Sequence, residues 1–122
     1  MKANYTKLGH PIFILSIILL LLNNNNKITS LDELGKISNR FRSDGKSVVL
    51  CHGMFDLIHL GHIRYFKEAK KEGDILIVTL TSDDFCRKGP DRPIFAENLR
   101  AESLAALEII DYIAICPYPS AI

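Results

Sequence analysis

Apolar residues occur in short continuous runs, and amphipathic stretches separate one run from the next. Three of the runs, at 47–52, 74–80 and 112–116, have the length and composition of buried strands. Between them, apolar residues recur at helical spacing over about 60–72 and 96–108. The order strand–helix–strand–helix–strand predicts an α/β domain whose parallel strands are joined by right-handed crossovers.

A further helix is predicted ahead of the first strand. Ser30 stands three residues before Glu33, which is the spacing of a capping box, and Gly45 is suited to end the helix. Residues 82–84 should cap a short helical turn, and 89–93 should form a loop. The residues expected to face the core are Leu31, Leu34, Ile37, Phe41, Ile63, Phe66, Ala69, Leu99, Leu104 and Leu107, and those expected in water are Lys67, Lys70 and Lys71.

The first 29 residues differ from the rest of the chain. A nearly continuous apolar run, 12–22, is followed by asparagines at 23–26. The run is shorter than the roughly 20 residues that a membrane-spanning helix needs, and no Ala-x-Ala-like cleavage site follows it. We therefore divide the chain into a leader, 1–29, and a domain, 30–122. A membrane-associated helix at 12–22 and a secretion signal are the alternatives for the leader.

Composition and charge indicate which class of molecule the chain binds. The chain has 122 residues and a formal net charge of +1, so it lacks the electrostatic character of a nucleic-acid-binding protein. Its three cysteines, Cys51, Cys86 and Cys116, form no Cys-x-x-Cys motif and are predicted to be reduced, mostly buried thiols. A cytoplasmic domain that binds a small molecule fits these features.

The most informative segment links the first predicted strand to the helix after it. His59 and His62 share one face of the first helical turn, because they are three residues apart. Gly61 between them removes a side chain, so that a ligand can approach the backbone closely. In open α/β sheets, phosphate ligands bind outside the carboxyl ends of strands and next to helix N-termini. The segment therefore predicts a site for an anionic, phosphate-bearing substrate.

Residues 53–62 read Gly-x-Phe-Asp-x-x-His-x-Gly-His, a pattern that resembles the signature of the cytidylyltransferase-like nucleotidyltransferases. Within that family the chain is most similar to the sugar-phosphate branch, which includes heptose 1-phosphate adenylyltransferases and glycerol-3-phosphate cytidylyltransferases. The downstream matches are Thr81-Ser82-Asp83, Lys88-Gly89, Arg92-Pro93, Leu99-Arg100 and the stretch from Ala105 to Tyr112. The resemblance implies a Rossmann-like, three-layer parallel sheet with flanking helices. We expect this fold to be incomplete, because no later helix–strand unit and no Ser/Thr-rich nucleotide motif follow in the sequence.

The resemblance also implies a reaction, in which a nucleotidyl group passes from ATP or CTP to a sugar phosphate and pyrophosphate is released. Mg²⁺ is the implied cofactor, and no metal site built by the protein is expected. The two histidines would stabilise charge on the α-phosphate, and a lysine and an arginine further on match phosphate-binding residues of relatives. The implied site residues are His59, His62 and Lys88 for catalysis, and Gly53, Met54, Phe55, Asp56, Gly61, Asp83 and Arg100 for nucleotide binding.

Three of these residues have structural alternatives. Asp56 could cap a helix, order the loop by accepting backbone N–H bonds, or help to hold Mg²⁺. Lys88 could be an ordinary solvated charge. Arg100 could pair with Glu97 or Glu102 on its own helix.

Other residues near the motif are not expected to take part in catalysis or to bind a metal. His52, on the strand, is expected to pack or to form a hydrogen bond inside the fold. Cys51 beside it should point to the opposite face of the strand, which rules out a thiol nucleophile activated by that histidine. A zinc site built from the histidines and Asp56 fits no common ligand spacing.

Two further functions compete with the enzyme. One is a nucleotide-binding fragment without catalysis, and the other is a membrane-tethered interaction protein anchored by 12–22. A homodimer is a further expectation, because a three-stranded sheet would leave apolar surface exposed around 112–115.

Overall fold

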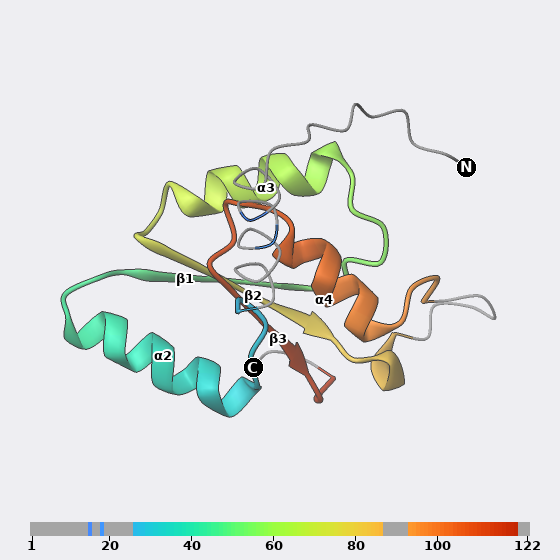
Figure 1. Ribbon diagram of the computed structural model, residues 1–122, viewed down its shortest axis with the longest axis horizontal. Coiled ribbons are helices and arrows are strands. Elements are labelled where there is room, and N and C mark those ends of the chain that lie inside the picture. Colours follow the sequence, from blue (N-terminus) through green and yellow to red (C-terminus); the bar gives the residue numbers. More distant parts are fainter. Residues whose placement is uncertain (1–14, 16–17, 19–25, 87–92, 120–122) are drawn as a thin grey trace.

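The computed structural model describes residues 15, 18, 26–86 and 93–119, and within these ranges it contains one parallel sheet with helices on both faces (Figure 1). The elements follow the predicted order. They are α2 (Leu31–Ser43), β1 (Val48–Gly53), α3 (Leu60–Lys70), β2 (Ile75–Thr81), the short 3-10 helix η1 (Asp83–Phe85), α4 (Glu97–Ala105) and β3 (Tyr112–Cys116).

The strands lie in the order β1-β2-β3, and both neighbouring pairs are parallel. Figure 1 shows α3 and α4 on one face of the sheet and α2 on the other, which gives the predicted three-layer α/β architecture. The central strand β2 is buried from Leu76 to Leu80. Its uninterrupted apolar sequence is explained by this position, because helices cover it on both sides. The fold class predicted from the sequence is confirmed.

The core is divided between the two faces of the sheet. The larger cluster lies beneath α3 and α4, and the smaller one, formed by Leu34, Ile77 and Ala114, lies beneath α2. Ser30 caps α2 as predicted, since its hydroxyl accepts a hydrogen bond from the Glu33 backbone N–H at 3.1 Å. The buried members of the larger cluster are Cys51, Phe55, Phe66, Leu76, Val78, Leu80, Ala101, Leu104, Ala105, Ile110 and Ile113.

Three details differ from the sequence prediction. Leu99 was expected to face the core but is 47% exposed, because Arg100 and Ala101 take the inward positions of α4. Lys70 was expected in water, yet its ammonium lies 2.5 Å from Asp111 Oδ2 and its side chain is only 30% exposed. Ser82 makes no side-chain cap to η1.

Residues 27–29 already belong to the sheet region. Ile28 forms an isolated parallel bridge with Ile113, and Thr29 donates a backbone hydrogen bond to the Ile113 carbonyl at 2.8 Å. The rest of the predicted leader lies outside the described residues except for positions 15, 18 and 26, so most of the apolar run 12–22 is not described. Among the residues that the structure describes, no helix combines the length and hydropathy needed to cross a bilayer.

Candidate active site

The candidate site lies at the carboxyl end of β1, where the chain turns into α3. Phe55 adopts a positive φ of 50°, which is uncommon for a bulky residue and marks a sharply constrained turn. Its buried ring stands 5.2 Å from the Phe66 ring and 5.6 Å from the His62 ring, between centroids. A Cβ on Gly53 would come within 2.8 Å of the Phe55 ring. Gly53 therefore leaves the space that this ring occupies.

The two histidines of the motif hold each other in place at the start of α3. His59 is the N-cap residue, and its Nδ1 accepts a hydrogen bond from the Gly61 backbone N–H at 3.0 Å. The His59 backbone N–H in turn donates to Nδ1 of His62 at 3.2 Å. The ring centroids are 4.0 Å apart. The pair is thus a capping box built from imidazoles.

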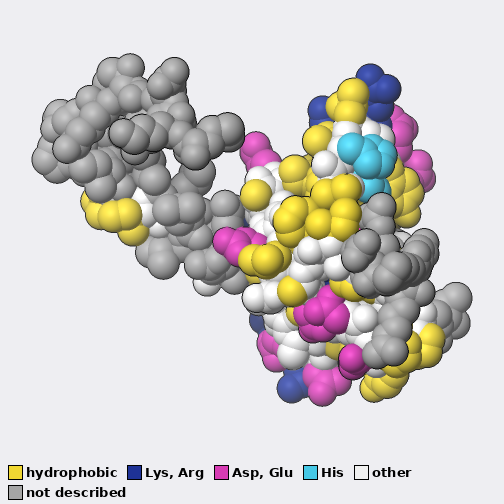
Figure 2. Space-filling model, turned by 90° about the vertical axis from the view of Figure 1, so that its right-hand side faces the viewer, with side chains coloured by type: hydrophobic (Ala, Val, Ile, Leu, Met, Phe, Trp, Pro, Cys, Tyr) yellow, Lys and Arg dark blue, Asp and Glu magenta, His cyan; other side chains and the backbone are white. Residues whose placement is uncertain are grey.

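These bonds determine which nitrogen of each ring can donate to a ligand. A ring nitrogen that accepts from a backbone N–H carries no proton, so the proton of each neutral ring sits on Nε2. His59 is exposed and His62 is half-buried. Figure 2 shows histidine side chains at the surface among hydrophobic ones. The arrangement presents two donors at a helix N-terminus, where the helix dipole favours an anion.

The protonation of His62 is also biased by its surroundings. Burial lowers the pKa of this imidazole from its ordinary value, and the neighbouring His59 lowers it further. The neutral form with Nδ1 as an acceptor is therefore favoured near neutral pH.

Gly61 has a more specific role than access to the backbone. A Cβ at this position would lie 2.7 Å from Cε1 and 2.9 Å from Nδ1 of the His59 ring. The space that the missing side chain leaves is filled by this imidazole, and the close approach lets Gly61 N–H reach it. The glycine in the motif is needed for the position of His59.

Asp56 orders the turn, which was one of its predicted alternatives. Its two carboxylate oxygens accept backbone N–H bonds from Ile94 at 2.8 Å and Phe95 at 2.9 Å. The bonds join the turn after β1 to the residues that precede α4, almost 40 positions along the chain.

Arg100 is buried beneath the same corner, with its side chain 0% exposed. Its Nη2 lies 2.7 Å from Asp83 Oδ1, and its other hydrogen bonds go to the backbone carbonyls of Met54, Thr81 and Phe95. It pairs with neither Glu97 nor Glu102 in the described contacts, so this alternative is wrong. Glu97 instead accepts the Asp83 backbone N–H at 3.1 Å, a bond that nothing in the sequence spacing indicated.

The structure thus brings most predicted site residues to one corner of the sheet. Arg100 contacts both Met54 and Asp83, and Phe55 touches His62. Lys88 lies outside the described residues, so its role stays a prediction. Contact of any of these residues with a nucleotide also stays a prediction.

The described residues do not build a cage for a metal ion. They contain no group of three or more His, Cys, Asp or Glu side chains placed to hold one. The nearby carboxylates are engaged, since Asp56 accepts two backbone N–H bonds and Asp83 holds Arg100.

His52 and the cysteines have structural roles, as predicted. His52 Nδ1 lies 2.8 Å from Thr79 Oγ1 on the neighbouring strand, while Cys51 is buried in the core on the other face. Cys51, Cys86 and Cys116 are all free and buried. Burial raises the pKa of the Cys86 thiol, which keeps it protonated.

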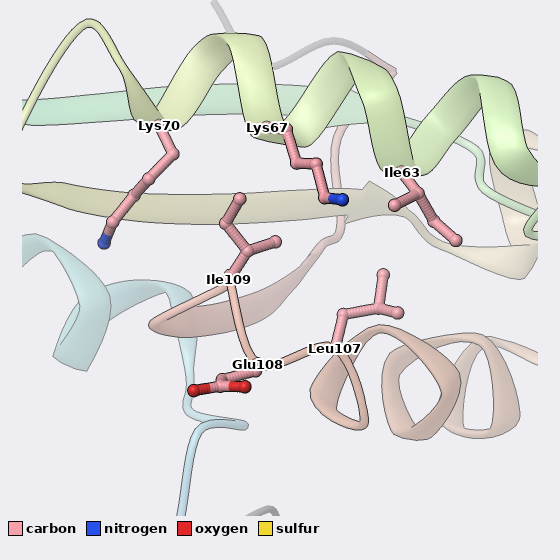
Figure 3. A pocket seen from close by; sticks show the side chains of 6 residues that line it. All are labelled: Ile63, Lys67, Lys70, Leu107, Glu108 and Ile109. Carbon is pink, nitrogen blue, oxygen red and sulfur yellow. The ribbon is translucent and has the colours of Figure 1, made fainter.

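A groove of about 430 Å³ lies away from the histidines, further along α3 (Figure 3). Figure 3 shows Ile63, Lys67 and Lys70 from α3 facing the segment 107–109, which follows α4. Its lining is mainly apolar, and none of the predicted site residues contributes to it.

The structure combines a parallel α/β sheet with a His-x-Gly-His pair at the start of the helix after its first strand, the arrangement that the resemblance to nucleotidyltransferases implied. The chain belongs to the cytidylyltransferase-like family, whose sequence model matches residues 50–118. The family predicted from the motif is confirmed.

The chain is similar to several proteins named "Bifunctional protein HldE". That of Citrifermentans bemidjiense is 45% identical over 93 residues, which are 75% of this chain and 19% of the relative. That of Campylobacter fetus subsp. fetus is 46% identical over 91 residues, 73% of this chain and 19% of the relative. The chain therefore spans about a fifth of the length of these curated relatives.

A solved structure supports the fold. The lipopolysaccharide core biosynthesis protein from Thermoplasma volcanium GSS1 is 39% identical, with a TM-score of 0.56 over 59% of this chain and 59% of that chain.

Proposed function

We propose that the protein transfers a nucleotidyl group from a nucleoside triphosphate to a sugar phosphate and releases pyrophosphate. The observation that carries the proposal is the imidazole pair His59–His62 at the N-terminus of α3, whose Nδ1 atoms both accept backbone N–H bonds, so that Nε2–H of each ring is left as a donor. Membership of the cytidylyltransferase-like family and similarity to bifunctional HldE proteins support it.

In the proposed reaction, a phosphate oxygen of the sugar phosphate attacks the α-phosphorus of the triphosphate in line with the leaving group. One P–O bond forms at the α-phosphorus, and the bond from it to the bridging oxygen of the β-phosphate breaks. Negative charge grows on the α-phosphate oxygens in the transition state. The two Nε2–H donors and the positive end of the α3 dipole stabilise this charge, without a change in protonation of either ring.

The remaining roles follow from the family resemblance. We propose that the backbone near Gly53, Met54 and Phe55 lies beside the triphosphate and that Lys88 binds one of its phosphates. Mg²⁺ is the proposed cofactor; bound to triphosphate oxygens, it would neutralise part of their negative charge. The heptose-type pattern favours ATP over CTP as the donor. The three buried free thiols fit the reducing cytoplasm.

The test is pyrophosphate release from ATP and from CTP, with Mg²⁺, across a panel of heptose, glycerol and related phosphates. We expect release only with one class of acceptor. His59→Ala and His62→Ala should each reduce turnover on the order of 100–1,000-fold, because each removes one donor to the transition state. His52→Asn is the control, because His52 bonds Thr79 on the neighbouring strand and is not part of the pair; it should retain turnover.

Two outcomes contradict the proposal. Absence of release with every acceptor and both nucleotides would do so, and nucleotide binding without turnover would then identify a binding module. Equal turnover in the wild type and in both alanine variants would show that the histidine pair does not act on the reacting phosphate.

A further inference from the structure

Arg100 is a charged side chain placed in the interior directly below the turn that carries the histidines. We infer that Arg100 and Asp83 are positioning residues, which hold the His59–His62 pair in place relative to the end of β2, and that Arg100 does not contact phosphate. The inference deepens the proposed function and rests on it for the turnover measurement. It assigns to Arg100 a role different from the phosphate contact that the family resemblance implies.

The hydrogen bonds of Arg100 leave little capacity for a ligand. Nη1 donates to Met54 O at 2.8 Å and to Thr81 O at 2.7 Å, and Nε donates to Phe95 O at 3.0 Å. Nη2 donates to Asp83 Oδ1 at 2.7 Å. A guanidinium has five N–H groups and stays charged in proteins, so its burial requires such partners. With the side chain 0% exposed, a phosphate could reach it only if this set of bonds opened.

The acceptors come from three segments that are distant in sequence. Met54 belongs to the turn after β1, Thr81 and Asp83 to the end of β2 and the start of η1, and Phe95 to the residues before α4. Removal of one side chain would therefore release three segments together. Two further hydrogen bonds join the same segments. The Asp56 carboxylate accepts from the Phe95 backbone N–H, and the Glu97 carboxylate accepts from the Asp83 backbone N–H.

The connection from Arg100 to the histidines runs through Met54 and Phe55. Met54, whose carbonyl Arg100 holds, is followed by Phe55, which turns the chain with its positive φ. The Phe55 ring packs edge-on against His62, whose Nδ1 accepts the His59 backbone N–H. A shift of Met54 would thus move the Phe55 ring and then both imidazoles. Errors of about 1 Å in the position of a catalytic group can cost on the order of 100-fold in rate.

The experiment compares Arg100→Lys, Asp83→Asn and their combination with the wild type, using the whole chain. Arg42→Lys, an exposed arginine of α2 that bonds Asn39, is the matched control. Three quantities are measured: kcat and KM for nucleotide, the nucleotide Kd by calorimetry, and the imidazole NMR resonances of His59 and His62. Thermal melting establishes that each variant is folded.

A positioning role predicts that Arg100→Lys lowers kcat on the order of 100-fold, changes the nucleotide Kd by less than about threefold, and shifts both imidazole resonances. The effects of Arg100→Lys and Asp83→Asn should be less than additive, since both break the same contact. If Arg100→Lys does not fold, Asp83→Asn carries the same expectations, because the partner of Arg100 is half-exposed and its loss is milder.

The inference is overturned if Kd weakens about tenfold or more while the imidazole resonances stay in place, which is the result for a phosphate contact. It is also overturned if the resonances and kcat both remain as in the wild type. If the wild type has no turnover, the proposed function fails, and the imidazole resonances still decide the positioning role independently.

Discussion

At the scale of single residues, the site depends on how two imidazoles replace the usual side chains of a helix cap. A serine or aspartate at an N-cap would satisfy the first backbone N–H groups with oxygen. Here His59 and His62 perform this task with Nδ1, and this leaves Nε2–H of each ring as a donor to a ligand. One pair of residues therefore both starts α3 and supplies the donors for an anion.

Gly61→Ala tests this arrangement with a single methyl group. The new Cβ would lie 2.7 Å from Cε1 of His59, so the ring must swing away and lose its bond to residue 61. We expect turnover to fall on the order of 100-fold, as for the loss of one donor, while the melting curve remains cooperative. Pyrophosphate release and thermal melting measure the two effects.

Gly35→Ala is the matched control. Gly35 lies on an exposed part of α2, and a Cβ there would meet nothing within 4 Å. The control should leave turnover unchanged and stabilise the protein by about 1 kcal/mol through helix propensity. Wild-type turnover in Gly61→Ala would contradict the role of the glycine.

At the scale of elements, side-chain contacts join strands at both ends of the sheet. At the amino ends, the Asp74 carboxylate accepts from the Ser47 backbone N–H at 2.9 Å and from its hydroxyl at 3.2 Å. This links the start of β2 to the start of β1. At the carboxyl ends, Arg100 links the same two strands beneath the histidine pair.

The Asp74 contact predicts a dependence on pH. The hydrogen bonds from Ser47 lower the pKa of this carboxyl below its ordinary value of 3.8, and nearby lysines add to the effect. The folded state then binds its proton less readily than the unfolded state, so the stabilisation is present above pH 3.8 and is lost as the pH falls through the lower, folded-state pKa. Asp74→Asn should be less stable at neutral pH and should lose less stability on acidification.

Urea unfolding from about pH 7 to about pH 3 measures this difference. Asp84→Asn, an exposed carboxyl of η1, is the control and should follow the wild-type curve. An Asp74→Asn curve parallel to the wild type at acid pH would exclude the proposed linkage.

At the scale of the whole molecule, stability depends on the apolar layer between the sheet and the helices α3 and α4. Phe66 is fully buried in this layer, and its ring contacts that of Phe55. The same layer supports the turn at Phe55, so packing and site geometry are coupled. A hydrogen bond from the Lys70 ammonium to the Asp111 carboxylate joins the end of α3 to the residue before β3.

Phe66→Ala should lower the free energy of unfolding by about 3–5 kcal/mol, because it removes a buried ring and leaves a cavity. Tyr118→Ala removes an aromatic side chain that is 60% exposed and should cost much less. Denaturant midpoints of both variants provide the measurement. A similar decrease in the free energy of unfolding in Phe66→Ala and Tyr118→Ala would mean that the layer below α3 is not the main source of stability.

Much of the fold could be predicted because its signals are local. The apolar runs at 74–80 and 112–116, the capping pattern at Ser30 and the histidine spacing specify strands, a helix start and a phosphate-type site without reference to distant residues. Leu99 was misplaced because helical periodicity alone cannot show that a charged neighbour, Arg100, takes the inward position.

The sequence by itself determined the parallel α/β order, the family and the place of the histidine pair, since each depends on spacing along a continuous segment. Tertiary structure alone decided that Gly61 makes room for an imidazole, that Asp56 holds Ile94 and Phe95, and that Arg100 joins three segments. The physical reason is that a buried charge or a close contact selects its partners by distance in space. Partners such as Met54 and Arg100 are brought together only when the sheet and its helices have packed.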